Sequence, residues 1–205
     1  FQTITSGTSV IGEGYTGDGT SGVYIFGAML EAGSYSTSYI PNHGTSGGVT
    51  RAADSCSVTG ASDVIGQTEG TFFVDFTIPE TQGPSFFSIS DGTYANRIIF
   101  GYTAGTLRYY VNSSTGGFSV SRTIDSSPVV GQTYKIALAY KNNDFKVYKN
   151  GTNTNTETTF TTPSSLTAID NQGGGVGQFI FAEVKQFLLF NERLTNAELA
   201  TLTTL

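Results

Sequence analysis

The residues able to do catalytic chemistry are few and lie far apart along the chain. Hydrolysis of a sugar chain needs a pair of carboxyl groups on one face of the protein, one acting as an acid and the other as a nucleophile or base. On a strand, such a pair would stand as Glu-x-Asp-x-Glu or a close variant. Asp75 has Phe73 and Thr77 as its same-face neighbours, and Glu183 has no acidic residue two positions away on either side. We therefore predict that the chain is not an enzyme.

The chain also offers few residues for nucleophilic catalysis or for zinc binding. The only histidine, His43, lies in a Gly-rich segment that could not hold a base in fixed geometry, and the only cysteine is Cys56. This pair is too small a set for a zinc site, and a single cysteine forms no disulfide framework. The glycine-rich stretch 173–177 lacks the Lys-Ser/Thr pair and the following helix of a phosphate-binding loop, so it is interpreted as a turn.

A recognition surface is better supported than an active site. A sugar-binding site needs planar side chains for stacking and polar groups for hydroxyls, and in a chain without tryptophan the stacking would fall to tyrosine. Tyrosine and arginine exposed together are typical of recognition surfaces. The outward positions of strands with apolar alternate residues predict one polar-aromatic face made of Arg97, Arg108, Tyr110, Asn112 and Tyr148. Taken singly, each is also compatible with an ordinary solvent-facing strand residue.

Alternation of apolar and polar residues recurs along the second part of the chain. Residues 106–112, for example, place Leu107, Tyr109 and Val111 on one face. Such alternation, interrupted by Gly and Asn turn signals, is typical of an antiparallel β-sandwich with one face of each sheet buried. The predicted fold class is therefore all-β. Strands are expected at residues 71–79, 85–90, 96–103, 106–112, 133–141 and 145–149, and the Asn150-Gly151 pair is expected to form the turn that ends the last of them.

One short helix is predicted near the C-terminal end. Thr195 is a natural N-cap, and Glu198 three residues later completes a capping box. Leu194 before the cap and Leu199 after it can form a hydrophobic staple. Leu199 and Leu202 share one face, which we expect to pack against the sandwich.

The first part of the chain has the signals of an incomplete domain. Residues 22–31 alternate enough for one strand, yet a free-standing sandwich needs more strands than this segment offers. We therefore assign residues 1–41 to the C-terminal strands of an upstream β module, 42–53 to a Gly/Ser/Thr-rich linker and 54–205 to the sandwich. Packing of the first segment on a neighbouring subunit is the alternative.

Charge and hydropathy argue against two classes of partner. The net charge is −6 and the ten basic residues are spread singly, so no basic run is present to neutralise phosphates, and we expect no nucleic-acid partner. The apolar run 179–190 is interrupted by Glu183 and Lys185 and falls short of a membrane span. We therefore expect no membrane insertion.

Three segments resemble the concanavalin A-like lectin/glucanase family, also described as laminin G-like. They are an opening core strand at 66–76, a central hairpin at 134–151 that ends in Asn-Gly, and a last long strand with its capped helix at 182–199. The stretch 22–54 resembles the junction that leads into such a domain in phage tail and receptor-binding proteins and in secreted bacterial adhesins.

The resemblance implies a jelly-roll sandwich that recognises a cell-surface glycan or receptor without catalysis, as part of a phage tail fibre or a similar surface protein. It also implies a homo-oligomer, commonly a trimer, at the virion surface or in an extracellular setting. Two alternatives stay open. The domain could be a structural decoration or assembly module of a virion, or the targeting module of a secreted polysaccharide-degrading enzyme.

Calcium is the one cofactor that the resemblance keeps open, because related lectin-like domains often hold Ca²⁺ through loop oxygens. Calcium needs about six to eight oxygen ligands, and no Asp-x-Asp-x-Asp loop gathers them here. Formation of turns is therefore the favoured role of the loop aspartates, with a calcium ion near Asp91, Asp144 and Asp170 as the alternative. The aspartates in predicted turns are Asp91, Asp125, Asp144 and Asp170.

Overall fold

The chain divides into two compact units, Phe1–Ala52 and Ala53–Leu205. The computed structural model describes residues 18–20, 22, 24–31, 38–42, 44, 47–49, 57–78, 85–114, 117–170 and 183–205. Every strand and helix of these residues lies in the second unit. The role of residues 1–41 as the end of an upstream module stays a prediction.

The described residues of the first unit form no strand. The alternation at 22–31 predicted one, but a strand exists only where a partner accepts and donates its backbone hydrogen bonds. Tyr24, Phe26 and Leu30 of this segment are exposed. The ring of Phe26 lies 5.8 Å from that of Tyr39, measured between centroids. A strand in this segment would therefore need a partner beyond the described residues.

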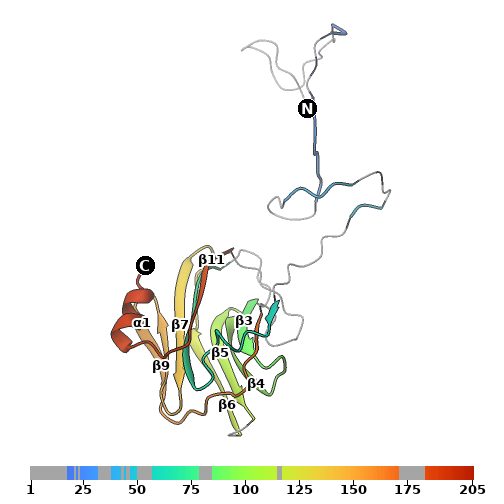
Figure 1. The fold of residues 1–205 in the computed structure, drawn as a ribbon. Coiled ribbons are helices and arrows are strands. Elements are labelled where there is room, and N and C mark those ends of the chain that lie inside the picture. Colours follow the sequence, from blue (N-terminus) through green and yellow to red (C-terminus); the bar gives the residue numbers. More distant parts are fainter. Residues whose placement is uncertain are drawn as a thin grey trace. The chain divides into compact units, whose positions relative to one another are not determined.

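Eleven strands of the described residues form two antiparallel sheets that pack face to face (Figure 1). The first sheet has the order β1 (Ser57–Thr59), β10 (Ala168–Asp170), β3 (Ser85–Ser90), β4 (Asn96–Thr103), β5 (Thr106–Ser113) and β6 (Phe118–Asp125). The second has the order β11 (Glu183–Phe190), β2 (Glu69–Thr77), β7 (Thr133–Lys141), β8 (Phe145–Lys149) and β9 (Thr152–Glu157). The predicted all-β, jelly-roll sandwich is confirmed.

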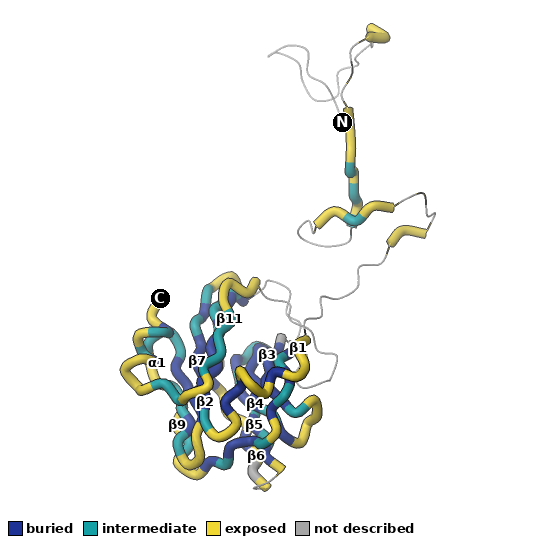
Figure 2. Tube along the Cα trace, in the orientation of Figure 1, coloured by how far each residue is buried: buried dark blue, intermediate teal, exposed yellow. Residues whose placement is uncertain are grey.

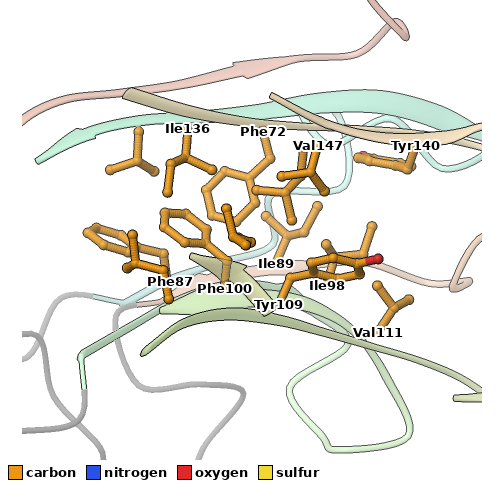
Figure 3. Close-up of a cluster of buried hydrophobic side chains, with 14 of the residues drawn as sticks. Phe72, Phe87, Ile89, Ile98, Phe100, Tyr109, Val111, Ile136, Tyr140 and Val147 are labelled. Atoms are coloured by element: carbon orange, nitrogen blue, oxygen red, sulfur yellow. The ribbon is translucent and has the colours of Figure 1, made fainter. Parts of the chain in front are cut away.

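The inward side chains of both sheets form one hydrophobic core, in which they point toward one another (Figure 3). On β4, Phe100 stacks on Phe87 of β3 with ring centroids 5.1 Å apart, and it meets Phe72 of β2 edge-on at 5.6 Å. Burial of each such ring stabilises the fold by about 1.5–3 kcal/mol. Figure 2 shows that buried positions follow the strands, whereas many of the turns between them are exposed. The core therefore fixes which face of each strand points outward.

The predicted helix is present as α1 (Asn196–Leu202) and covers the outer face of the second sheet (Figure 1). The Thr195 hydroxyl accepts from the backbone N–H of Glu198, and the Glu198 carboxylate accepts from the backbone N–H of Thr195, so the capping box is complete. Leu199 is fully buried against Phe73 and Ala137. No helix among the described residues is long and apolar enough to cross a membrane.

The Asn150-Gly151 turn also forms as predicted. Both residues have positive φ, 48° and 82°, which Asn and Gly tolerate at low steric cost. The Asn150 side chain accepts a hydrogen bond from the backbone N–H of Lys135 at 2.9 Å. This contact ties the end of the β8–β9 hairpin to the neighbouring strand β7.

Candidate functional site

A polar face covers the outer side of the first sheet, and it contains four of the five residues predicted to bind a ligand. On β5, Arg108, Tyr110 and Asn112 alternate with residues that are buried in the core, so their side chains point outward. On β4, Arg97 lies directly opposite Asn112. All four residues are half-buried. We call these four residues, together with Tyr94, the polar face.

Three contacts hold Tyr110 and Arg108 in place. Tyr110 lies edge-on to Phe86 of β3, with ring centroids 6.3 Å apart and an interplanar angle of 66°. The Nη2 atom of Arg108 donates to the Ser121 hydroxyl on β6 at 3.0 Å. The guanidinium carbon of Arg108 lies 5.9 Å from the centre of the Tyr110 ring. These contacts present an aromatic ring and a cation side by side.

Arg97 is positioned differently from Arg108. Its guanidinium carbon lies 4.3 Å above the centre of the Tyr94 ring, a cation–π arrangement. Burial lowers the pKa of Arg97, while the charges of Tyr94, Asp170 and Tyr110 act in the opposite direction. Asp170 itself accepts a hydrogen bond from the Ser88 hydroxyl at 2.7 Å. Arg97 is therefore a cation that the chain already places beside a carboxylate.

Tyr94 belongs to the polar face but was missed by sequence reasoning. It lies in the turn between β3 and β4, outside any alternating pattern, and 48% of its surface is exposed. Only its contact with Arg97 reveals its place. The Asp91-Gly92 motif in the sequence predicts a tight turn, but it does not indicate the direction in which the Tyr94 side chain points.

Asp91 holds the turn that carries Tyr94. Its carboxylate accepts from the backbone N–H and hydroxyl of Thr93, at 2.8 and 2.6 Å, and from the side chain of Asn96 at 2.9 Å. Burial acts to raise the pKa of Asp91, but the hydrogen bonds from Thr93 and Asn96 together outweigh it and lower the pKa. The favoured prediction, that this aspartate forms a turn, agrees with these contacts.

The other aspartates considered for calcium are also bound by donors of the chain itself. Asp144 pairs with Arg193 at 3.0 Å, and Asp125 pairs with Lys149. Asp170 is bound by Ser88. Within the described residues, no group of three or more His, Cys, Asp or Glu side chains is arranged to hold a metal ion. The calcium alternative gains no support from these contacts.

Tyr148, the fifth predicted residue, lies elsewhere, and its assignment to the polar face was wrong. It lies on β8 in the second sheet, opposite Ala137. Only 8% of its surface is exposed, because Leu199 of α1 and Phe73 of β2 pack against it. Alternation correctly placed the side chain outside the main core, but the helix that follows some fifty residues later covers that side of the sheet.

Asp75, considered above as a possible catalytic carboxylate, has a lysine and a glutamine directly opposite it on the neighbouring strands. Asp75 on β2 lies directly opposite Lys135 of β7 on one side and Gln186 of β11 on the other. Glu183, the other carboxylate considered, lies opposite Thr77 at the start of β11. His43, Cys56 and the turn predicted at 173–177 lie outside the described residues.

The fold is a jelly-roll sandwich, a pair of antiparallel sheets around one core, and the outer face of one sheet carries arginine, tyrosine and asparagine. The family model described as the concanavalin A-like lectin/glucanases superfamily, Laminin_G_3, matches residues 70–200. The chain belongs to this superfamily, which confirms the resemblance found in the sequence. Comparison with curated protein sequences gives no match.

Solved structures with the same fold come from several kinds of protein. The CBM40 module of the Ruminococcus gnavus IT-sialidase has a TM-score of 0.58 and 17% identity, over 71% of this chain and 88% of that one. The same module has also been solved bound to α2,3-sialyllactose. The binding domain of botulinum neurotoxin serotype G has a TM-score of 0.57 and 12% identity, over 72% of this chain and 39% of that one. At these identities the likeness concerns the fold.

Proposed function

We propose that this domain is a non-catalytic recognition module that binds glycan through the polar face. The observation that carries the proposal is the shared outward orientation of Arg97, Arg108, Tyr110 and Asn112 on two adjacent strands. An aromatic ring, two guanidinium groups and an amide on one rigid surface are the groups that sugar recognition uses.

The rigidity of the strands favours binding on this face. The inward neighbours Tyr109 and Val111 are fully buried, so the backbone that carries Arg108, Tyr110 and Asn112 is fixed by the core. A preformed face loses little conformational freedom when a ligand binds, which favours affinity. The glycan-bound relative named above supports glycan as the ligand class for this proposal.

The proposal includes a setting for the domain. We place it in a phage tail fibre or a similar surface protein, at the virion surface or outside the cell, as a homo-oligomer that is commonly a trimer. This setting rests on the resemblance of residues 22–54 to the junctions that precede such domains. A cell-surface glycan or receptor would be the partner, with no role for nucleic acid.

A glycan array probed with the full chain tests the function. The double variant Arg108→Ala/Tyr110→Ala removes the cation and the ring, and we expect it to lose binding. The matched control is Lys146→Ala/Thr156→Ala on the second sheet, where the Lys146 ammonium donates to the Thr156 hydroxyl at 3.1 Å. This control removes a similarly half-buried cation and its contact, and we expect it to bind normally.

Two outcomes would reject the proposal. If the folded chain binds no glycan on the array, recognition of sugars fails, and an assembly role becomes the better explanation. If both double variants bind as tightly as the unmodified chain, a glycan site exists on another surface and the polar face is excluded.

A further inference from the structure

We propose that the polar face selects sugars that carry a carboxylate, and that Arg108 is the residue that binds it. This inference rests on the proposed function, because it names the ligand class for the same face. The described lysines and arginines differ in how their positive charge is neutralised.

Four of the nine lysines and arginines in the described part form an ion pair with a carboxylate, and a fifth has a carboxylate nearby. Ion pairs join Arg122 to Glu157, Lys141 to Glu69, Lys149 to Asp125 and Arg193 to Asp144. Arg97 on the polar face has Asp170 as a nearby negative charge. The lysines with neutral hydrogen-bond acceptors all lie on the second sheet, at Lys135, Lys146 and Lys185.

Arg108 is the exception on the polar face. Its hydrogen bond goes to the neutral hydroxyl of Ser121, at an exposed position. Its Nε atom is buried and has no hydrogen-bond partner among the described residues. No ion pair of Arg108 occurs in the described ranges. Nε is closed to a ligand because it is buried, but the single bond to Ser121 leaves the positive charge and further donors of the terminal guanidinium nitrogens free for an incoming acid.

The chemistry of the guanidinium group favours a carboxylate. Its planar fork of donors matches the two oxygens of a carboxylate, and such charge-assisted pairs are stronger than bonds to neutral hydroxyls. Because the Arg108 side chain is half-buried, its charge is less well solvated than that of a fully exposed cation. A negatively charged ligand compensates for part of the solvation that the Arg108 charge has lost. A neutral sugar compensates for less of it.

The neighbours of Arg108 suit the rest of such a sugar. Same-face positions along a strand are roughly 7 Å apart, so Tyr110 can stack on the ring of a sugar whose carboxylate reaches Arg108. Asn112, the next outward residue, offers an amide that both donates and accepts hydrogen bonds. Arg97 contributes differently, because it lies over Tyr94 and close to Asp170.

The test compares acidic sugars with neutral sugars of the same shape. The full chain is titrated calorimetrically with oligogalacturonate and with 3′-sialyllactose, and then with the carboxyl-reduced form of each. The two acidic probes separate a uronic acid from a sialic acid as the source of the carboxylate. We expect at least one acidic probe to bind roughly ten- to a hundredfold more tightly than its neutral partner, the usual gain from a charged hydrogen bond.

Three variants assign the preference to Arg108. Arg108→Gln should abolish the difference between the acidic sugar and its neutral partner, and Arg108→Lys should keep part of it, since the charge remains without the fork. Lys146→Gln makes the same change of charge on the other sheet and should change nothing. Circular dichroism and the melting temperature of Arg108→Gln should match those of the unmodified chain.

The outcomes separate this inference from the proposed function. Binding confined to neutral or sulfated sugars, or an acid preference that survives Arg108→Gln, overturns the carboxylate inference and leaves glycan recognition standing. Absence of binding to these probes and to every sugar of the array overturns both.

Discussion

Tyr109 donates a hydrogen bond from its hydroxyl to Oε1 of Glu157, 2.8 Å away, and this bond joins the two sheets. Tyr109 lies on β5 of the first sheet and Glu157 ends β9 of the second. Nε of Arg122 lies 3.1 Å from the same carboxylate oxygen. Burial, assisted by the hydrogen bond and charge of Glu157, raises the pKa of Tyr109, so the hydroxyl keeps its proton and remains a donor.

Removal of the Tyr109 hydroxyl should weaken this link. We expect Tyr109→Phe to lower the free energy of unfolding by about 0.5–1.5 kcal/mol, the usual net value of one hydrogen bond. The measurement is urea denaturation followed by circular dichroism. Tyr102→Phe is the control, because Tyr102 is equally core-facing and its hydroxyl has no hydrogen-bond partner in the described part of the chain. An equal loss in both variants would contradict the role of the Glu157 contact.

Most of the fold could be predicted because its strands alternate. The bounds expected for residues 85–90, 96–103, 133–141 and 145–149 agree with β3, β4, β7 and β8. The strand β6, the short strands β1 and β10, and the polar strand β9, with the sequence Thr-Asn-Thr-Asn-Thr-Glu, were missed. A strand of polar residues has no apolar face to reveal its period, and it forms here because β8 provides backbone partners.

The polar face could be predicted from the sequence only for those of its residues that lie on strands. Alternation distinguishes the two sides of a strand, so it correctly grouped Arg108, Tyr110 and Asn112. It carries no information about what covers the outer side of each sheet. The helix α1 buries Tyr148 through contacts between residues far apart in sequence, and Tyr94 joins the face from a turn. Both facts require the tertiary structure.

The ion pair between Asp125 and Lys149 should give part of the stability a dependence on acid pH. Burial acts to raise the pKa of Asp125, but the hydrogen bonds and charge of Lys149, with the backbone N–H of Ser127, outweigh it and lower the pKa. A carboxyl group whose pKa is lower in the folded state contributes stability above its unfolded pKa, about 3.9, and loses it as the pH falls through the folded pKa.

Asp125→Asn should therefore be less stable than the unmodified chain at pH 7, and the difference should shrink as the pH falls below about 4. Urea midpoints at pH 7, 5 and 3 measure this. Lys149→Met removes the partner and should reduce the same acid-dependent part. A difference between Asp125→Asn and the unmodified chain that stays constant down to pH 2.5 would count against the ion pair as its cause.

The capping box of α1 should control how firmly the helix covers the second sheet. Thr195→Ala removes the hydroxyl that accepts from the Glu198 N–H, and we expect a loss of about 1 kcal/mol, as for other N-caps. Thr195→Ser keeps the oxygen and should lose much less. Amide hydrogen exchange of residues 196–203 measures the opening of the helix. Unchanged exchange in Thr195→Ala would show that packing of Leu199 alone holds the helix.

Tyr110 and Tyr148 should respond in opposite ways to the same substitution, although both were predicted to bind ligand. Tyr148 packs under α1 with Leu199 and Phe73, so Tyr148→Ala creates a cavity and should cost about 3–5 kcal/mol of stability, as for other large aromatic truncations. Tyr110 is half-buried on the polar face and contacts Phe86, so Tyr110→Ala should change stability far less.

Ligand binding should show the reverse order. Tyr110→Ala removes the ring proposed to stack on a sugar and should weaken glycan binding about tenfold or more, given roughly 1.4 kcal/mol or more for the lost contact. Tyr148→Ala, measured at a temperature at which it is folded, should bind as the unmodified chain does. Calorimetric titration and thermal denaturation of the two variants provide the comparison. If Tyr148→Ala lost binding while folded and Tyr110→Ala kept it, the ligand would have to contact the second sheet, because the two rings lie on the outer faces of different sheets.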